Sequence, residues 1–110
     1  MGKHESVFIL KRYAPSPSPK NISFWRTAVR TYYELSSVDK KYTDRTIKAL
    51  DIAINLAPTD PKLYYNKALI LETQGKKDEE IQNLMQALIL KPNYLEAKTT
   101  LDEATASAKP

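Results

Sequence analysis

The feature that most constrains this chain is a repeat of fixed period. Between residues 47 and 93, five apolar or proline positions recur with their residue numbers offset by 34. The matched pairs are Ile47 and Ile81, Leu50 and Leu84, Ala53 and Ala87, Leu56 and Leu90, and Pro58 and Pro92. A fixed period of this length is typical of repeat proteins, in which each unit buries its apolar face against its neighbour. The sequence therefore predicts a stack of similar units.

The spacing of apolar residues within the units predicts helices and no strands. We expect helix pairs over residues 21–57 and 60–91, followed by a single helix over residues 93–108. Pro58 and Pro92 should end the second and fourth helices, because the residue before proline avoids helical backbone angles. Pro61 fits the first turn of the third helix, and Gly75 should end that helix in a left-handed conformation.

Polar residues at the helix starts predict their caps. Asn21 or Ser23 should cap the first helix and Asp60 the third, by accepting a bond from a free backbone N–H. Asn93, with Glu96 three residues later, resembles a capping box for the last helix. The apolar stripe of that helix is narrow and its other side is polar, as in the terminal helix of a stack of repeats.

Residues 1–20 differ in composition from the rest of the chain. Pro15, Pro17 and Pro19 alternate with serines, which removes backbone donors and favours an extended linker. We expect a flexible N-terminal tail at residues 1–20 and one folded domain at residues 21–108. The apolar run at residues 7–10 is too short for a signal peptide, and no run in the chain has the length of a membrane helix.

The residue types present argue against an enzyme. The chain has no Cys, and its only His is His4 in the expected tail. A nucleophilic triad needs a positioned base, and a zinc site needs several Cys or His ligands. The acidic run Asp78-Glu79-Glu80 is explained by the helix dipole, which favours negative charge in a first turn. We therefore expect no catalytic residues, no cofactor and no metal.

The second unit resembles the tetratricopeptide repeat (TPR) family. The family's large, small and large positions of the first helix fall on Tyr64, Ala68 and Leu71, and its turn glycine falls on Gly75. Its second helix matches at Leu84 and Ala87. Two positions depart from the family pattern: Lys67, where an aliphatic residue is preferred, and Glu80, where a small one is preferred.

The first unit resembles the family less regularly. Its best matches are Trp25, Val29 and Tyr32 in the first helix, and Leu50, Ala53 and Pro58 in the second. About five extra residues should lie between these helices, near residues 36–41. The resemblance implies an all-α fold, a right-handed TPR-type superhelix of antiparallel helix pairs, with two repeats and a C-terminal capping helix.

A narrower resemblance concerns the repeat tail of some bacterial O-antigen ligase-like membrane proteins. It is carried by the runs at residues 24–27, 32–33, 56–62, 65–66 and 91–94. In those proteins the tail follows a membrane region and lies outside the cytoplasmic membrane. The resemblance implies an extracytoplasmic place for this segment, whereas a stand-alone TPR protein would be cytoplasmic by default.

In the TPR family the first helices line a concave groove that holds a peptide or a partner helix. The candidate groove residues of this chain are Arg26, Arg30, Tyr33, Lys62, Tyr65, Leu69, Glu72 and Thr99, with Ser23 and Glu103 at its edges. The carboxylate-clamp members use Lys and Asn at set positions, and only Lys62 and Asn66 agree with that pattern here.

Charge favours an acidic partner for this groove. Residues 1–58 hold 10 Lys and Arg against 5 Asp and Glu, whereas residues 59–110 hold 7 against 8. We expect Arg26, Arg30 and Lys62 to converge, unmatched by a local acid, as a seat for a carboxylate, with Tyr65 beside them. The competing view is that Glu34, Glu72 or Glu103 neutralises these cations.

Three functions agree with the sequence. The first is a protein-interaction module that binds a peptide in its groove. The second is a fragment of an O-antigen ligase-like or polymerase-like membrane protein, used for docking or assembly. The third is a self-associating scaffold, which would form a weak homo-oligomer. Nucleic-acid binding is not expected, because Tyr32, Tyr42 and Tyr64 fall on predicted core faces.

Overall fold

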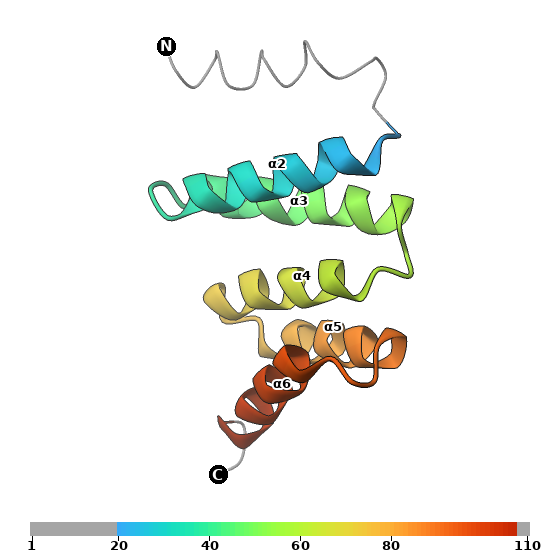
Figure 1. Cartoon of the computed structure of the whole chain (residues 1–110). Helices are drawn as coiled ribbons and strands as arrows, with labels where there is room; N and C mark the ends of the chain where they lie inside the picture. Colours follow the sequence, from blue (N-terminus) through green and yellow to red (C-terminus); the bar gives the residue numbers. More distant parts are fainter. Residues whose placement is uncertain (1–19, 108–110) are drawn as a thin grey trace, which may run out of the picture.

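The computed structural model describes residues 20–107, and this part of the chain is all-α (Figure 1). It contains five helices and no strand. Their bounds are α2 at Ile22–Ser36, α3 at Lys41–Leu56, α4 at Pro61–Thr73, α5 at Lys77–Leu90 and α6 at Leu95–Ser107. The predictions made for residues 1–19, including most of the N-terminal tail, lie outside the described residues.

The helix ends follow from local chemistry at most positions. The side chain of Asn21 accepts a hydrogen bond from the backbone N–H of Ser23 at 2.9 Å, and Asp60 accepts one from Lys62 at 3.1 Å. Pro61 occupies the first turn of α4, where its missing N–H has no partner to lose. Gly75 has a φ of 73°, the left-handed conformation expected of a residue that follows a helix. These caps and this stop confirm the sequence predictions.

The predicted start of the last helix is wrong. Helix α6 begins at Leu95, so Asn93 lies in the preceding turn and does not cap it. Within that turn the backbone N–H of Tyr94 donates to the carbonyl of Lys91 at 3.1 Å. Tyr94 is buried against the body of the protein, and the turn that places it there delays the helix.

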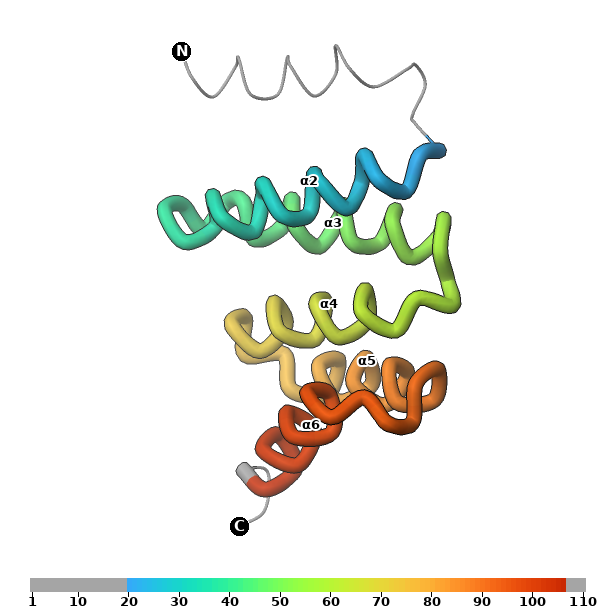
Figure 2. Tube along the Cα trace, in the orientation of Figure 1, coloured from blue at the N-terminus to red at the C-terminus, as the bar shows by residue number. Residues whose placement is uncertain are grey.

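The helices form two hairpins and one final helix (Figure 2). Helices α2 and α3 run antiparallel to each other, α4 and α5 do the same below them, and α6 crosses α5 at a steep angle (Figure 1). One buried apolar cluster joins α2, α3 and α4, and a second joins α4, α5 and α6. The first cluster comprises Ala28, Val29, Ala49, Leu50, Ala53, Leu63 and Ile70; the second comprises Ala68, Leu84, Ala87, Tyr94, Ala97 and Ala104.

Helix α4 belongs to both clusters because it is apolar on two sides. Leu63 and Ile70, seven residues apart, face the first hairpin, whereas Ala68 faces α5. A helix that buries two faces in this way connects consecutive units into one body.

The repeat period extends to the packing of α6. Leu63 and Ile70 dock α4 on the first hairpin, and one period later Ala97 and Ala104 dock α6 on the second. All four side chains are at most 3% exposed. Helix α6 therefore repeats the register of α4, with alanine in place of two larger residues.

The second helices of the two hairpins also correspond. Leu50 and Leu84 are both 0% exposed, as are Ala53 and Ala87. The burial that the sequence predicted for Leu84 and Ala87 is thereby confirmed. At these matched positions the second helix of each hairpin packs against the first helix of that hairpin and against the helix that follows it.

No helix in residues 20–107 combines the length and the apolar character that a membrane crossing requires.

Candidate functional site

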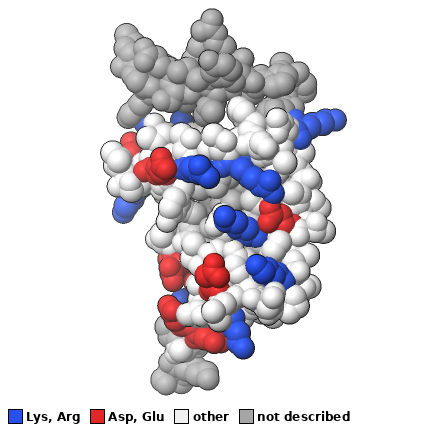
Figure 3. Space-filling view, viewed as in Figure 1, with Lys and Arg blue, Asp and Glu red and all other residues white. Residues whose placement is uncertain are grey.

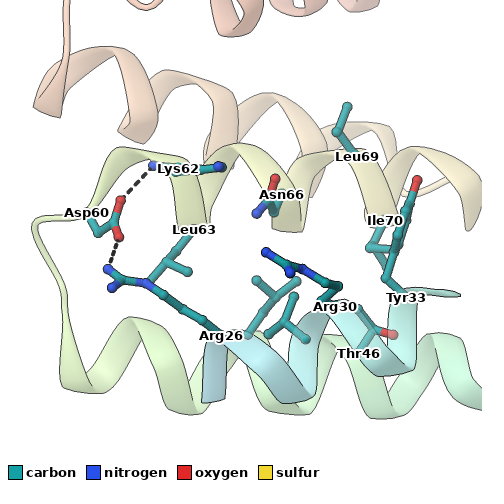
Figure 4. A pocket seen from close by; sticks show the side chains of 12 residues that line it. Arg26, Arg30, Tyr33, Thr46, Asp60, Lys62, Leu63, Asn66, Leu69 and Ile70 are labelled. Atoms are coloured by element: carbon teal, nitrogen blue, oxygen red, sulfur yellow. Dashed lines mark hydrogen bonds and ion pairs between the residues drawn. The ribbon is translucent and has the colours of Figure 1, made fainter. Parts of the chain in front are cut away.

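A cleft of about 470 Å³ lies between α2 and α4, and side chains from α3 and α4 form its floor (Figure 4). Helix α2 contributes Val29 and three larger side chains, α3 contributes two residues, and α4 contributes the opposite wall. The lining residues are Arg26, Val29, Arg30, Tyr33, Thr46, Leu50, Asp60, Lys62, Leu63, Asn66, Leu69 and Ile70. The volume is in the range of sites that bind small molecules or several side chains of a peptide.

The floor of the cleft is apolar and its rim is polar. Leu50, Leu63 and Ile70 form the floor and are almost fully buried in the first core cluster. Thr46 adds a buried hydroxyl to the floor, and its Oγ1 donates to the carbonyl of Tyr42 at 2.7 Å. Because that hydroxyl is already bonded, the floor offers a ligand apolar contact.

One end of the cleft is closed by an ion pair between its two walls. The guanidinium of Arg26 on α2 donates to the carboxylate of Asp60 at the start of α4 (Figure 4). The other carboxylate oxygen of Asp60 accepts from the backbone N–H of Lys62. The expectation that Arg26 is unmatched by a local acid is therefore wrong. Its partner is Asp60, whose role as a helix cap was predicted, and not Glu34, Glu72 or Glu103.

Arg30 lies one turn beyond Arg26 and is one of two cations available in the cleft. Its side chain extends from α2 towards α4, where Asn66 points towards it (Figure 4). Among residues 20–107, Arg30 forms no ion pair. Lys62 adds a second positive charge on the α4 wall. Two cations and an amide thus face one apolar floor.

The structure brings together five of the eight groove residues expected from the sequence. Arg26, Arg30, Tyr33, Lys62 and Leu69 line the cleft.

The other expected residues lie elsewhere. The ring of Tyr65 packs against that of Tyr94 with centroids 5.2 Å apart, so it does not flank the cations. Glu72 and Thr99 are exposed outside the cleft lining, and so are Ser23 and Glu103. These residues therefore do not line the cleft between α2 and α4.

Sequence reasoning missed several residues of the site. Leu63 and Ile70 form the floor, yet the helical stripe through Tyr64, Ala68 and Leu71 pointed to the other face of α4. The signal that could have found them was present: Leu63 and Ile70 are seven residues apart on the same helix, which is the spacing of a second apolar stripe.

The cleft continues towards the turn between α2 and α3. A second hollow of about 810 Å³ shares Tyr33 and Ile70 with the first and reaches Lys40, Asp44 and Gln74. Tyr33 is 51% exposed and stands at the junction of the two. A partner segment longer than one side chain can therefore extend along α4 beyond the cleft.

Charge is distributed unevenly over the face that Figure 3 shows. Lys and Arg side chains gather across its upper and middle parts, whereas Asp and Glu side chains gather towards its lower left edge. Opposite charges at a surface guide the orientation in which a charged partner approaches.

Four tyrosines of the described residues pack in pairs, Tyr32 with Tyr42 and Tyr65 with Tyr94. Tyr32 stacks on Tyr42 with centroids 6.2 Å apart, and Arg45 lies 5.3 Å from the Tyr42 ring. Burial raises the pKa of Tyr32, an effect that the nearby Arg45 partly opposes. Burial also raises the pKa of Tyr94, and the neighbouring Glu96 raises it further.

The described residues contain no group of three or more His, Asp or Glu side chains that could hold a metal ion. A scan against protein-family models finds no match for this chain, and a search among curated proteins finds no significant similarity.

Proposed function

We propose that this chain is a TPR-type protein-interaction module, and that it binds a segment of a partner protein in the cleft between α2 and α4. The observation that carries the proposal is the cleft itself. It has an apolar floor, with Lys62 on one wall and, on the other, Arg30, which forms no ion pair within residues 20–107. Clefts that combine an apolar surface with a few placed polar groups are the usual sites of recognition.

The repeated register of the helices supports the TPR assignment. Hairpins that stack at the usual period of the family, with α4 buried on two sides, agree with the right-handed superhelix that the family forms. In this interpretation α6 is the capping helix, and the cleft between α2 and α4 is the first part of the concave surface.

The chemistry of the cleft favours an acidic segment with an apolar residue. Arg30 can bind a carboxylate through two parallel N–H groups, and Lys62 adds a point charge to the same space. Arg26 contributes less, because the Asp60 carboxylate already neutralises it. The apolar side chain of the segment would lie over Leu63 and Ile70. Binding through exposed cations should weaken with added salt.

The test compares two labelled ten-residue peptides by fluorescence anisotropy. One carries Glu on either side of a Leu, and the other has Gln in place of each Glu. The full chain should bind the acidic peptide more tightly, and Arg30→Ala should reduce that preference by about fivefold or more. Lys48→Ala, which removes an exposed cation outside the cleft, is the matched control and should leave it unchanged. Equal affinity of wild type for both peptides, at low and at high salt, would rule out the acidic partner.

A further inference from the structure

The second hairpin contains a buried carboxylate that accepts no hydrogen bond. Glu80, in the first turn of α5, is 0% exposed, and neither of its carboxylate oxygens has a hydrogen-bond partner. The ammonium of Lys77, one turn earlier, lies 3.6 Å from one oxygen, and the Lys77 side chain is 41% exposed. A buried carboxylate without hydrogen bonds is costly, so its presence calls for a physical explanation.

The repeat register places Glu80 at the junction of α4 and α6. Thr46, one period earlier, lines the cleft between α2 and α4. The same shift of one period carries Ile70, which lines that cleft beside Thr46, onto Ala104 of α6. By this correspondence, Glu80 occupies the position on α5 that Thr46 holds on α3, and Ala104 of α6 takes the place of Ile70 beside it.

Helix α6 packs on α5 through smaller side chains than those that α4 packs on the first hairpin. It offers Ala97 and Ala104 where α4 offers Leu63 and Ile70, so it buries less apolar surface. On the neighbouring surface of the same unit, Met85 remains 52% exposed, although the position one period earlier is the charged Asp51. Helix α6 also carries no basic residue that could meet Glu80, since its only Lys is Lys98, near its N-terminal end.

We propose that the α5 surface beneath α6 is a second binding site, for a partner helix with a large apolar residue and a basic residue seven positions later. The apolar residue would take the place of Ala97. The basic residue would take the place of Ala104 and pair with the Glu80 carboxylate. Helix α6 occupies the site in the free protein and is displaced by the partner. A basic helix is favoured over an acidic or neutral one, because a basic side chain would donate the hydrogen bonds that the Glu80 carboxylate lacks and that the Lys77 ammonium, 3.6 Å away, does not supply.

Two labelled peptides with the sequence of residues 94–107 test this assignment against the full chain. The basic peptide carries Ala97→Leu and Ala104→Arg, and the neutral peptide carries Ala97→Leu and Ala104→Met. Wild type should bind the basic peptide at least about tenfold more tightly, because the pair forms in a desolvated place. The chemical shifts that change on binding should belong to α5 and α6. In Glu80→Gln the preference for the basic peptide should disappear.

The outcomes separate this site from the cleft between α2 and α4. Arg30→Ala should leave the affinity for the basic peptide unchanged, so a failure at either site can be recognised without the other. Circular dichroism checks that Glu80→Gln is folded, which is expected because an amide costs less than a carboxylate to bury. No binding of either peptide, equal affinities, a preference that survives Glu80→Gln, or shift changes confined to α2 and α4 would each overturn the proposal.

Discussion

The carboxylate of Asp60 holds two helices at once: one oxygen caps α4, and the other accepts from Arg26 on α2. The two residues are 34 positions apart, which is the period of the repeat. This contact fixes the closed end of the cleft and leaves Arg30 and Lys62 as the cations of its open part.

Replacing Asp60 should separate its two roles. Asp60→Ala should lower the free energy of unfolding by ~1–2 kcal/mol through the lost cap, with a smaller loss from the half-exposed ion pair. Asp60→Asn keeps a capping oxygen and should lose only a few tenths of a kcal/mol. Urea unfolding followed by circular dichroism measures both changes. Asp102→Ala, at an exposed position of α6, is the control. Equal losses in the two Asp60 variants would show that the cap is unimportant.

Adjacent residues on α5 should respond very differently to truncation. Leu84 is 0% exposed in the second core cluster, whereas Met85 is 52% exposed. Leu84→Ala should cost ~2–5 kcal/mol, because it removes buried contacts and leaves a cavity. Met85→Ala should change stability by less than about 1 kcal/mol. Urea midpoints that fall together for the two variants would contradict the packing of the second hairpin.

Replacing the buried carboxylate of Glu80 should stabilise the protein. In Glu80→Thr the residue matches Thr46, whose hydroxyl donates to the carbonyl four residues earlier. Removing the carboxylate, which has no hydrogen bond, should raise the free energy of unfolding by ~1–3 kcal/mol, less any cavity left behind. The exposed neighbour supplies the control: Glu79→Thr should lose ~0.3–1 kcal/mol of favourable interaction with the helix dipole. Thermal melts of the two variants should therefore shift in opposite directions. A lower melting temperature for Glu80→Thr would show that the carboxylate has a stabilising contact.

Tyr94 should make stability depend on pH in alkaline solution. Burial raises the pKa of its phenol in the folded protein above the ordinary value of 10.0. The folded state thus holds this proton more tightly than the unfolded chain does. The contribution of Tyr94 is complete below pH 10 and is lost as the pH rises through the folded pKa.

The variant Tyr94→Phe tests this dependence. It keeps the ring that packs on Tyr65 and removes the titrating group. Its urea midpoint should fall less steeply above pH 10 than that of wild type. The rise in tyrosinate absorbance at the alkaline end of the titration should also be smaller in the variant. Parallel curves for wild type and variant would contradict the buried placement of the phenol.

Much of the fold could be predicted from the sequence because the residues that begin and end its helices act locally. Pro61, Gly75 and the capping side chain of Asp60 act through the backbone within a few residues, so their effects can be read without tertiary contacts. The start of α6 was misplaced for the opposite reason. Asn93 satisfies a capping pattern, but the burial of Tyr94 decides where the chain turns.

The site was less predictable because it depends on how the units dock. Helical spacing places Tyr65 and Leu69 on one face of α4, yet Tyr65 packs against Tyr94 while Leu69 lines the cleft. Asp60, which pairs with Arg26, is already explained in the sequence as the cap of the third helix. Nothing in the sequence therefore indicated that it also forms an ion pair. Glu80 could be recognised as a departure from the family pattern, whereas its burial without a hydrogen bond required the structure.

The two core clusters also bear on how fast the chain can fold. The first draws its members from residues 28–70 and the second from residues 68–104, so neither requires the two ends of the domain to meet. Contacts between neighbours in sequence keep the entropy of loop closure small, and helical proteins of this kind fold in microseconds to milliseconds. Because α4 takes part in both clusters, either hairpin can form first and offer a template to the other. Substitutions at Leu63 and Ile70 should then slow the joining of the two hairpins more than the formation of either one.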